Sequence, residues 1–229
     1  MAKKLTLLLL LFAACLWAAD FWIAKPYTEW NDKEISKILS DSPWVGKVTI
    51  SMAPAGGGGG GAPSGKGGGN GPRGESAENA APGGGSSGPE VTLLWQTALP
   101  IKQALMKRKF GSEVAASPEA KGFIERKDEV YALTMAGLPA NLAQAAQGDK
   151  KAVLLGVTTL EVKGKEPVKA MDVQVSAAGR NMNLSFLFPR TTNFTAEDKE
   201  FEFVTKFDKT TVKHKFKLKD MVFNGKVEM

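Results

Sequence analysis

A glycine-rich stretch constrains the fold of this chain more than any other feature. Sixteen of its 25 glycines lie between Gly56 and Gly88. Each glycine costs about 1 kcal/mol relative to alanine in a helix interior, so we expect residues 53–89 to form a disordered linker rich in Gly, Pro and Ser. This linker is either a long loop between two paired strands or a tether. It separates an N-terminal part, residues 20–52, from a domain at 90–229.

The same stretch contains seven positions of a phosphate-binding pattern. Gly60, four further residues and Gly65-Lys66 match the start of G-x-x-x-x-G-K-[ST]. A phosphate loop needs a serine or threonine after the lysine to hold magnesium, and a helix whose N-terminus faces the phosphates. Here Gly67 follows the lysine, and the glycines after it do not start a stable helix. We therefore expect no bound nucleotide and no other cofactor.

The first 19 residues have the design of a signal peptide. Two lysines, Lys3 and Lys4, precede an apolar run that ends in small residues. This order is typical of secretory signals and predicts an exported protein, periplasmic or anchored to the envelope, and less readily extracellular. An ordinary peptidase would cut near Ala19. A lipoprotein peptidase would cut before Cys15 and leave it for lipidation, and an uncleaved membrane anchor is a third interpretation.

The segment after the leader predicts a short helix between two tryptophans, Trp30 and Trp44. Asn31 fits an N-cap, and Glu34 lies three residues later, as in a capping box. Apolar residues then recur at helical spacing, and Pro43 marks the end. Such a helix usually packs against its own domain, and Trp30 and Trp44 are alternatively residues that bind a partner or a membrane interface.

The rest of the chain predicts an α+β fold. Alternating apolar residues predict strands at Lys47–Met52 and Val91–Thr97, which could pair. Capping and stop signals predict helices at Leu99–Gly111, from Ser117 to near Arg126, and at Pro139–Gln147. From Lys151 onward the pattern predicts successive strands: a hairpin of 151–162 with 167–177, then "NLSFLF", "FEFVTKF", "TVKHKFKL" and a terminal hairpin with its turn at Asn224-Gly225. We expect a mostly antiparallel sheet with two or three helices on one face.

The reactive side chains exclude most familiar kinds of catalytic site. The chain has one histidine, His214, and one cysteine, Cys15. His214 lies in the apolar register of an expected strand and has no accompanying nucleophile motif. One ligand of each type cannot make a His- or Cys-rich zinc site. The acidic run 197–202 lacks the spacing of a calcium loop. We expect no catalytic and no metal-binding residues.

Alternating lysines mark one face of an expected strand. Lys213, Lys215 and Lys217 project from the same side and form a basic stripe. This stripe either protects a solvent-facing strand from aggregation or binds an acidic partner. The net charge of +6 is too mild to predict nucleic-acid binding. Another envelope protein or an anionic lipid surface is therefore the expected partner.

Two segments, "KPYTEWNDKEISKILSDSPW" and "EFEFVTKFDKTTVKHKFKLKDMVFNGKVEM", resemble uncharacterised exported bacterial proteins, some of which carry a GWxTD domain. They cover 50 of the 229 residues, and the GWxTD motif itself is absent. The resemblance implies export and a tryptophan-bracketed helix combined with a β-rich C-terminus. It implies no activity.

Together these patterns predict an exported envelope protein that acts as a non-catalytic binding or structural module. One alternative is an envelope hydrolase whose active site no motif reveals. Another is a structural subunit that donates a strand to a neighbour, with the Trp30–Trp44 segment or the terminal strand as donor.

Overall fold

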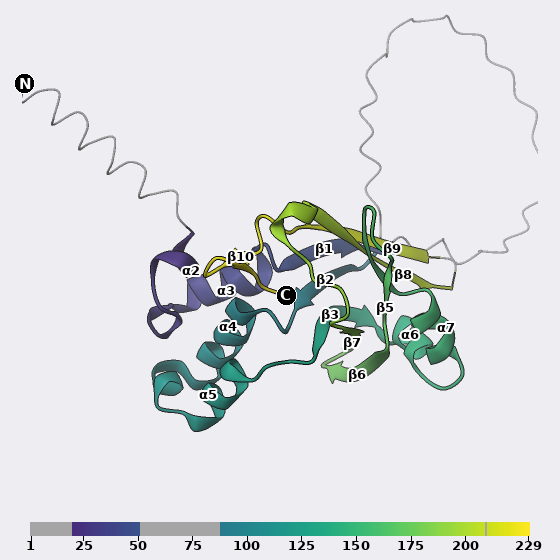
Figure 1. The fold of residues 1–229 in the computed structure, drawn as a ribbon. Coiled ribbons are helices and arrows are strands. Elements are labelled where there is room, and N and C mark those ends of the chain that lie inside the picture. The colour runs from purple at the N-terminus through teal and green to yellow at the C-terminus, as the bar shows by residue number, and fades with distance from the viewer. Residues whose placement is uncertain (1–19, 51–87, 209) are drawn as a thin grey trace, which may run out of the picture.

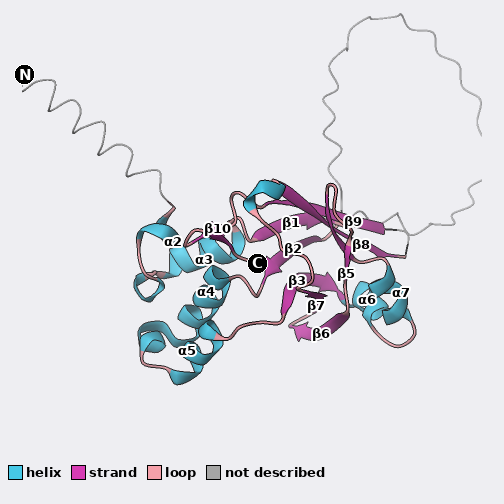
Figure 2. Ribbon diagram, viewed as in Figure 1, coloured by secondary structure: helices cyan, strands magenta, loops and turns pink. Residues whose placement is uncertain are grey.

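The computed structural model describes residues 20–50, 88–208 and 210–229 and confirms the α+β class (Figures 1 and 2). The helical segments are α2 (Phe21–Ala24), η1 (Tyr27–Glu29), α3 (Asp32–Ser40), α4 (Leu99–Phe110), η2 (Gly111–Ala115), α5 (Pro118–Glu125), α6 (Ala140–Ala143), η3 (Gln144–Ala146), α7 (Lys150–Gly156) and η4 (Ala196–Asp198). The strands are β1 (Val45–Thr49), β2 (Glu90–Trp95), β3 (Val130–Pro139), β4 (Thr159–Val162), β5 (Val168–Lys169), β6 (Asp172–Ala178), β7 (Asn181–Pro189), β8 (Glu200–Phe207), β9 (Thr210–Lys217), β10 (Val222–Phe223) and β11 (Lys226–Val227). In Figure 1, α2 to α5 gather at one end of the sheets, and α6 and α7 gather at the other.

The larger sheet has five antiparallel strands in the order β1-β2-β3-β7-β6. β1 and β2 pair along their whole length, from Val45 opposite Leu94 to Thr49 opposite Glu90. The predicted strands on either side of the glycine-rich stretch therefore lie side by side, as their alternation allowed. The stretch itself, with the Gly60 to Lys66 pattern, lies outside the described residues, as does the leader with Cys15.

The smaller sheet has four antiparallel strands in the order β5-β4-β8-β9. Its inner face packs on the inner face of the larger sheet. Trp95 of β2 makes edge-to-face contacts with Phe201 and Phe216, and Phe186 of β7 contacts Phe203. These rings belong to one continuous buried cluster, which explains why the inward residues of β2 and β8 alternate so regularly with exposed ones.

Local signals in the sequence set the ends of several elements. The Asn31 side chain accepts a hydrogen bond from the Glu34 amide, and the Glu34 carboxylate accepts one from the Asn31 amide, so the predicted capping box is confirmed. Gly111 ends α4 with a φ of 55°, a conformation that glycine adopts without strain. Asn224 and Gly225 both have positive φ and form the predicted two-residue turn between β10 and β11.

Two sequence expectations are wrong in part. Residues 151–156 belong to helix α7 and not to a strand, and only 159–162 form β4. The expected hairpin does exist between β4 and β5. However, the chain then crosses at Ala170 and Met171 to the larger sheet, where β6 pairs with β7. The run "KAVLLG" is apolar without a clear period, and such short runs are compatible with either a helix or a strand.

Candidate functional site

A groove of about 680 Å³ lies between α4, the segment after α5 and the C-terminal residues. Its walls come from Lys102 and Gln103 on α4, from residues 124–128, from Arg190 after β7, and from residues 226–229. No two of these four segments are neighbours in the sequence. Five cationic and three acidic side chains line this hollow, which we call the groove.

One wall of the groove contains a buried ion pair. Lys102 is only 4% exposed, and its Nζ lies 3.0 Å from Asp128 Oδ2 and donates to the Arg126 carbonyl at 2.7 Å. The guanidinium of Arg126 donates through Nε to the other carboxylate oxygen, Oδ1, at 2.9 Å. A single carboxylate is thus shared by two cations. Removing the Lys102 ammonium from water costs free energy. Its contacts with the Asp128 carboxylate and the Arg126 carbonyl offset that cost.

Arg190 extends the positive character of the groove. It donates to the Met229 carbonyl at 3.0 Å and to the Val130 carbonyl at 3.3 Å, and its guanidinium lies 4.3 Å from the centre of the Tyr131 ring. Burial raises the pKa of Tyr131, which therefore stays neutral and donates to the Thr192 carbonyl. Arg190 is exposed and forms no ion pair with an Asp or Glu side chain of the described residues.

Gln103, which lines the groove, carries an acceptor without a partner. Its Oε1 atom is buried and has no hydrogen-bond partner in the described structure. Buried polar atoms without a partner are rare because each costs about 1–3 kcal/mol. Since this oxygen is closed to solvent, a molecule in the groove would meet the cationic side chains and not Gln103 Oε1.

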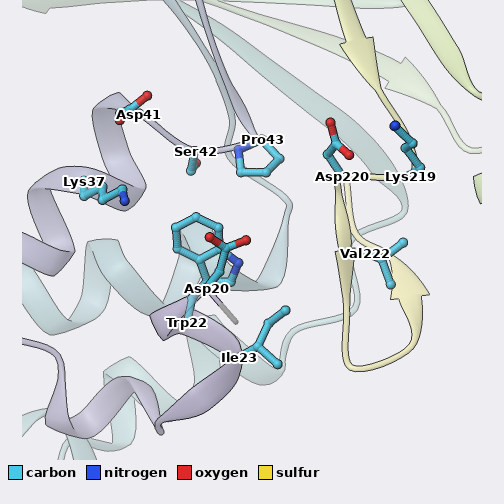
Figure 3. Close-up of a pocket in the computed structure, with 10 residues that line it drawn as sticks. All are labelled: Asp20, Trp22, Ile23, Lys37, Asp41, Ser42, Pro43, Lys219, Asp220 and Val222. Carbon is cyan, nitrogen blue, oxygen red and sulfur yellow. The ribbon is translucent and has the colours of Figure 1, made fainter. Parts of the chain in front are cut away.

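A second hollow, of about 640 Å³, lies where the chain leaves residues 1–19 (Figure 3). Its labelled side chains come from α2, from the end of α3 and from the turn after β9. Three aspartates and two lysines line it, so opposite charges nearly balance. Figure 3 shows Asp20 in the middle of the hollow, with Asp41 and Asp220 on opposite sides. These carboxylates do not converge on one point, and we do not assign a site here.

The two tryptophans that bracket α3 are core residues. Trp30 is 2% exposed and Trp44 is fully buried. The Trp44 indole donates to the Glu228 carbonyl at 2.8 Å, and its ring contacts Phe223 in the terminal hairpin. Neither tryptophan offers a surface to a partner in this structure. Both segments considered as donor strands are packed into the domain, because an apolar ring or strand must be buried somewhere.

The lysine stripe lies on the outer face of β9, as its alternation predicts. Lys215 Nζ is 2.7 Å from Glu200 Oε1, and Lys213 Nζ is 3.5 Å from Glu202 Oε2. The hydrogen bond from Lys215 lowers the pKa of Glu200. Lys217 lies opposite Glu200 in the β8–β9 register. Glutamates of the neighbouring strand thus offset the stripe, and its use as a partner surface remains a prediction.

His214 lies where β9 meets β1, with its ring against the backbone of Gly46 and 4.6 Å from the Phe216 ring. Burial lowers its pKa, which favours the neutral imidazole. Its surroundings are those of a packed side chain. Within the described ranges, no group of three or more His, Cys, Asp or Glu side chains is placed to hold a metal ion.

Sequence reasoning did not find the residues of the groove. Lys102, Asp128 and Arg190 have no shared motif, and each is ordinary in its local context. The sequence does indicate that Lys102 lies on a helix, because Pro100 and Gly111 mark the start and the end of α4.

No protein-family model, curated protein or solved structure matches the chain. Among the helices of the described residues, none is both long and apolar enough to span a bilayer.

Proposed function

We propose that this protein is an exported envelope protein that binds a small anionic ligand in the groove and does not catalyse a reaction. The observation that carries the proposal is that five cationic side chains, among them Arg190, Lys127 and Lys226, line one hollow with only three acidic side chains. The leader pattern and the resemblance to exported bacterial proteins support the location.

The excess of cations favours an anion over a cation as ligand. Lys127 and Lys226 are exposed at the groove and make no ion pair with the described part of the chain. Both can turn toward a ligand without breaking an internal contact. A bidentate guanidinium such as that of Arg190 suits a carboxylate or a phosphate. A carboxylated sugar would supply such a carboxylate.

Thermal-shift and calorimetric titrations with inorganic phosphate, acetate and an oligogalacturonate test the proposal. We expect at least one of these probes to bind, and Lys226→Gln to weaken that binding by a factor of a few. Arg190→Gln should weaken it about tenfold, since a hydrogen bond to a charged group contributes about 1.5–3 kcal/mol.

Lys121→Gln is the matched control, because Lys121 is exposed on α5 and does not line the groove. Lys226 is also exposed, so its variant should fold normally even if Arg190→Gln is destabilised. Equal affinity in all variants would place binding elsewhere. Turnover of an ester, peptide or glycoside that one substitution abolishes would instead support a hydrolase.

A further inference from the structure

Strand β6 is an open edge of the larger sheet. It is the last strand in the order β1-β2-β3-β7-β6 and pairs only with β7 among the described strands. The opposite edge, β1, is covered by β9, since the ring of His214 contacts the backbone of Gly46. Only β6 therefore leaves a seven-residue row of backbone groups next to no other strand of the described chain.

β6 itself contains no lysine, proline or bulge, although Lys151 of α7 pairs with Asp172 at the start of the strand. Natural edge strands carry lysines, prolines or bulges that stop another strand from docking. The β6 sequence is DVQVSAA, and its register with β7 runs without interruption from Asp172 to Ala178. Gln174, Ser176, Ala177 and Ala178 are all exposed, and their side chains are small or uncharged. The side chains in this half of β6 therefore present no charge and little bulk to another strand.

The exposed half of β6 is self-complementary. Two copies related by a twofold axis through Ser176 would pair antiparallel, with residue 174 opposite 178 and Ser176 opposite itself. In this register the start of β6, at Asp172, comes next to the partner subunit's turn after Ala178, which contains Arg180. Asp172 is on the solvent face of the sheet, because Val173 points inward and is buried.

Charge favours this register over its neighbours. Arg180 is exposed and has no ion-pair partner in the described structure. Asp172 is already 2.6 Å from Lys151, and its carboxylate is more than one-third exposed and can accept a second cation. In the proposed pair, the partner subunit's Arg180 follows the last paired residues directly, so that its long exposed side chain can approach the Asp172 carboxylate. Moving the axis half a residue toward Val175 would instead bring Met171 to the level of the partner subunit's residue 180 and separate the two opposite charges.

We propose that two copies of this chain dimerise by antiparallel pairing of β6 around Ser176, which joins their larger sheets into one ten-stranded sheet. This surface is separate from the groove, so the proposal does not depend on the proposed function. Met171, which is 59% exposed at the start of β6, would be covered by the partner subunit's turn at residues 179–181.

Sedimentation velocity of the full chain from micromolar to millimolar concentration tests the proposal. We expect a reversible shift from monomer to dimer. Ser176→Lys puts two like charges directly opposite each other at the axis and should weaken dimerisation at least tenfold. Ser36→Lys is the matched control, because Ser36 is exposed on α3 and far from β6 in the sheet order. Because residue 176 is exposed on an edge, the lysine variant should unfold at the same temperature as the parent at protein concentrations where both are monomers.

Cysteine cross-linking tests the register, in a chain whose single native cysteine is removed by Cys15→Ser. Ser176→Cys should form a disulfide-linked dimer, since directly opposed Cα atoms lie about 4.5–5.5 Å apart, within the range of a disulfide. Gln174→Cys should not, since its two copies would be about 13 Å apart along the strand. A monomer at every concentration, or equal cross-linking of both variants, overturns the proposal. A dimer that Ser176→Lys leaves intact overturns it as well.

Discussion

Replacing Gly46 with alanine should show how tightly β1 and β9 fit together. A Cβ atom at residue 46 would lie 2.5 Å from Cδ2 and 2.9 Å from Cε1 of His214, and closer still to Nε2. Non-bonded carbon atoms prefer about 3.5–4.0 Å. The imidazole has little freedom to withdraw, because its other side packs edge-to-face on Phe216. An overlap of this size costs about 1–3 kcal/mol of folding free energy.

The sign of the change separates this clash from a backbone effect. Gly46 does not have a positive φ, so alanine adds no backbone strain and by itself gains about 0.5–1 kcal/mol in a strand. We therefore expect Gly46→Ala to lower the free energy of unfolding by about 1–2 kcal/mol in the parent protein. In a His214→Ala background the same change should be neutral or stabilising.

Urea unfolding followed by tryptophan fluorescence measures both effects, with the slope m as a check that the unfolded state is unchanged. The two single variants and the double variant form a cycle, whose coupling energy should be about 1–3 kcal/mol. An equal loss in both backgrounds, or no loss in the parent, would refute the contact.

Two further predictions concern charge. Since burial holds the pKa of His214 below its usual 6.5, the unfolded chain binds this proton more readily, so stability is complete above about pH 6.5 and falls as the pH decreases below it. The urea midpoint should drop between about pH 7.5 and about pH 5.5. An equal drop of the midpoint over this pH range in His214→Asn would contradict this. Asp128→Asn leaves the Lys102 ammonium buried without its carboxylate and should cost about 3–5 kcal/mol, whereas Lys102→Met leaves Asp128 bonded to the exposed Arg126 and should cost clearly less. Equal unfolding free energies for these two variants would exclude the proposed asymmetry.

Elements with strong local signals could be predicted from the sequence. The capping box at Asn31, the glycine stop at Gly111 and the turn at Asn224-Gly225 each depend on residues only a few positions apart. Their geometry is therefore set by local steric and hydrogen-bonding preferences. Regular alternation in β2 was equally informative, because one face of that strand is fully buried.

Features that depend on distant residues could not be predicted. Helix α7 forms in a run that is compatible with either a helix or a strand, and Leu154 is buried in the common core. The crossing at Met171 places β5 and β6 in different sheets, and nothing in the local sequence marks it except the short gap between them. The groove is the extreme case, since Lys102 and Arg190 meet only after the sheets have assembled.

The hydrogen bond between Trp44 and Glu228 also has a consequence for the order in which the protein folds. It joins residues 184 positions apart, so the Trp44 indole reaches its native surroundings only once the segment around Glu228 has docked. Contacts of such high sequence separation form late, because the loop must close before they contribute. The packing around Trp44, between α3 and β1, is therefore completed at a late step of folding.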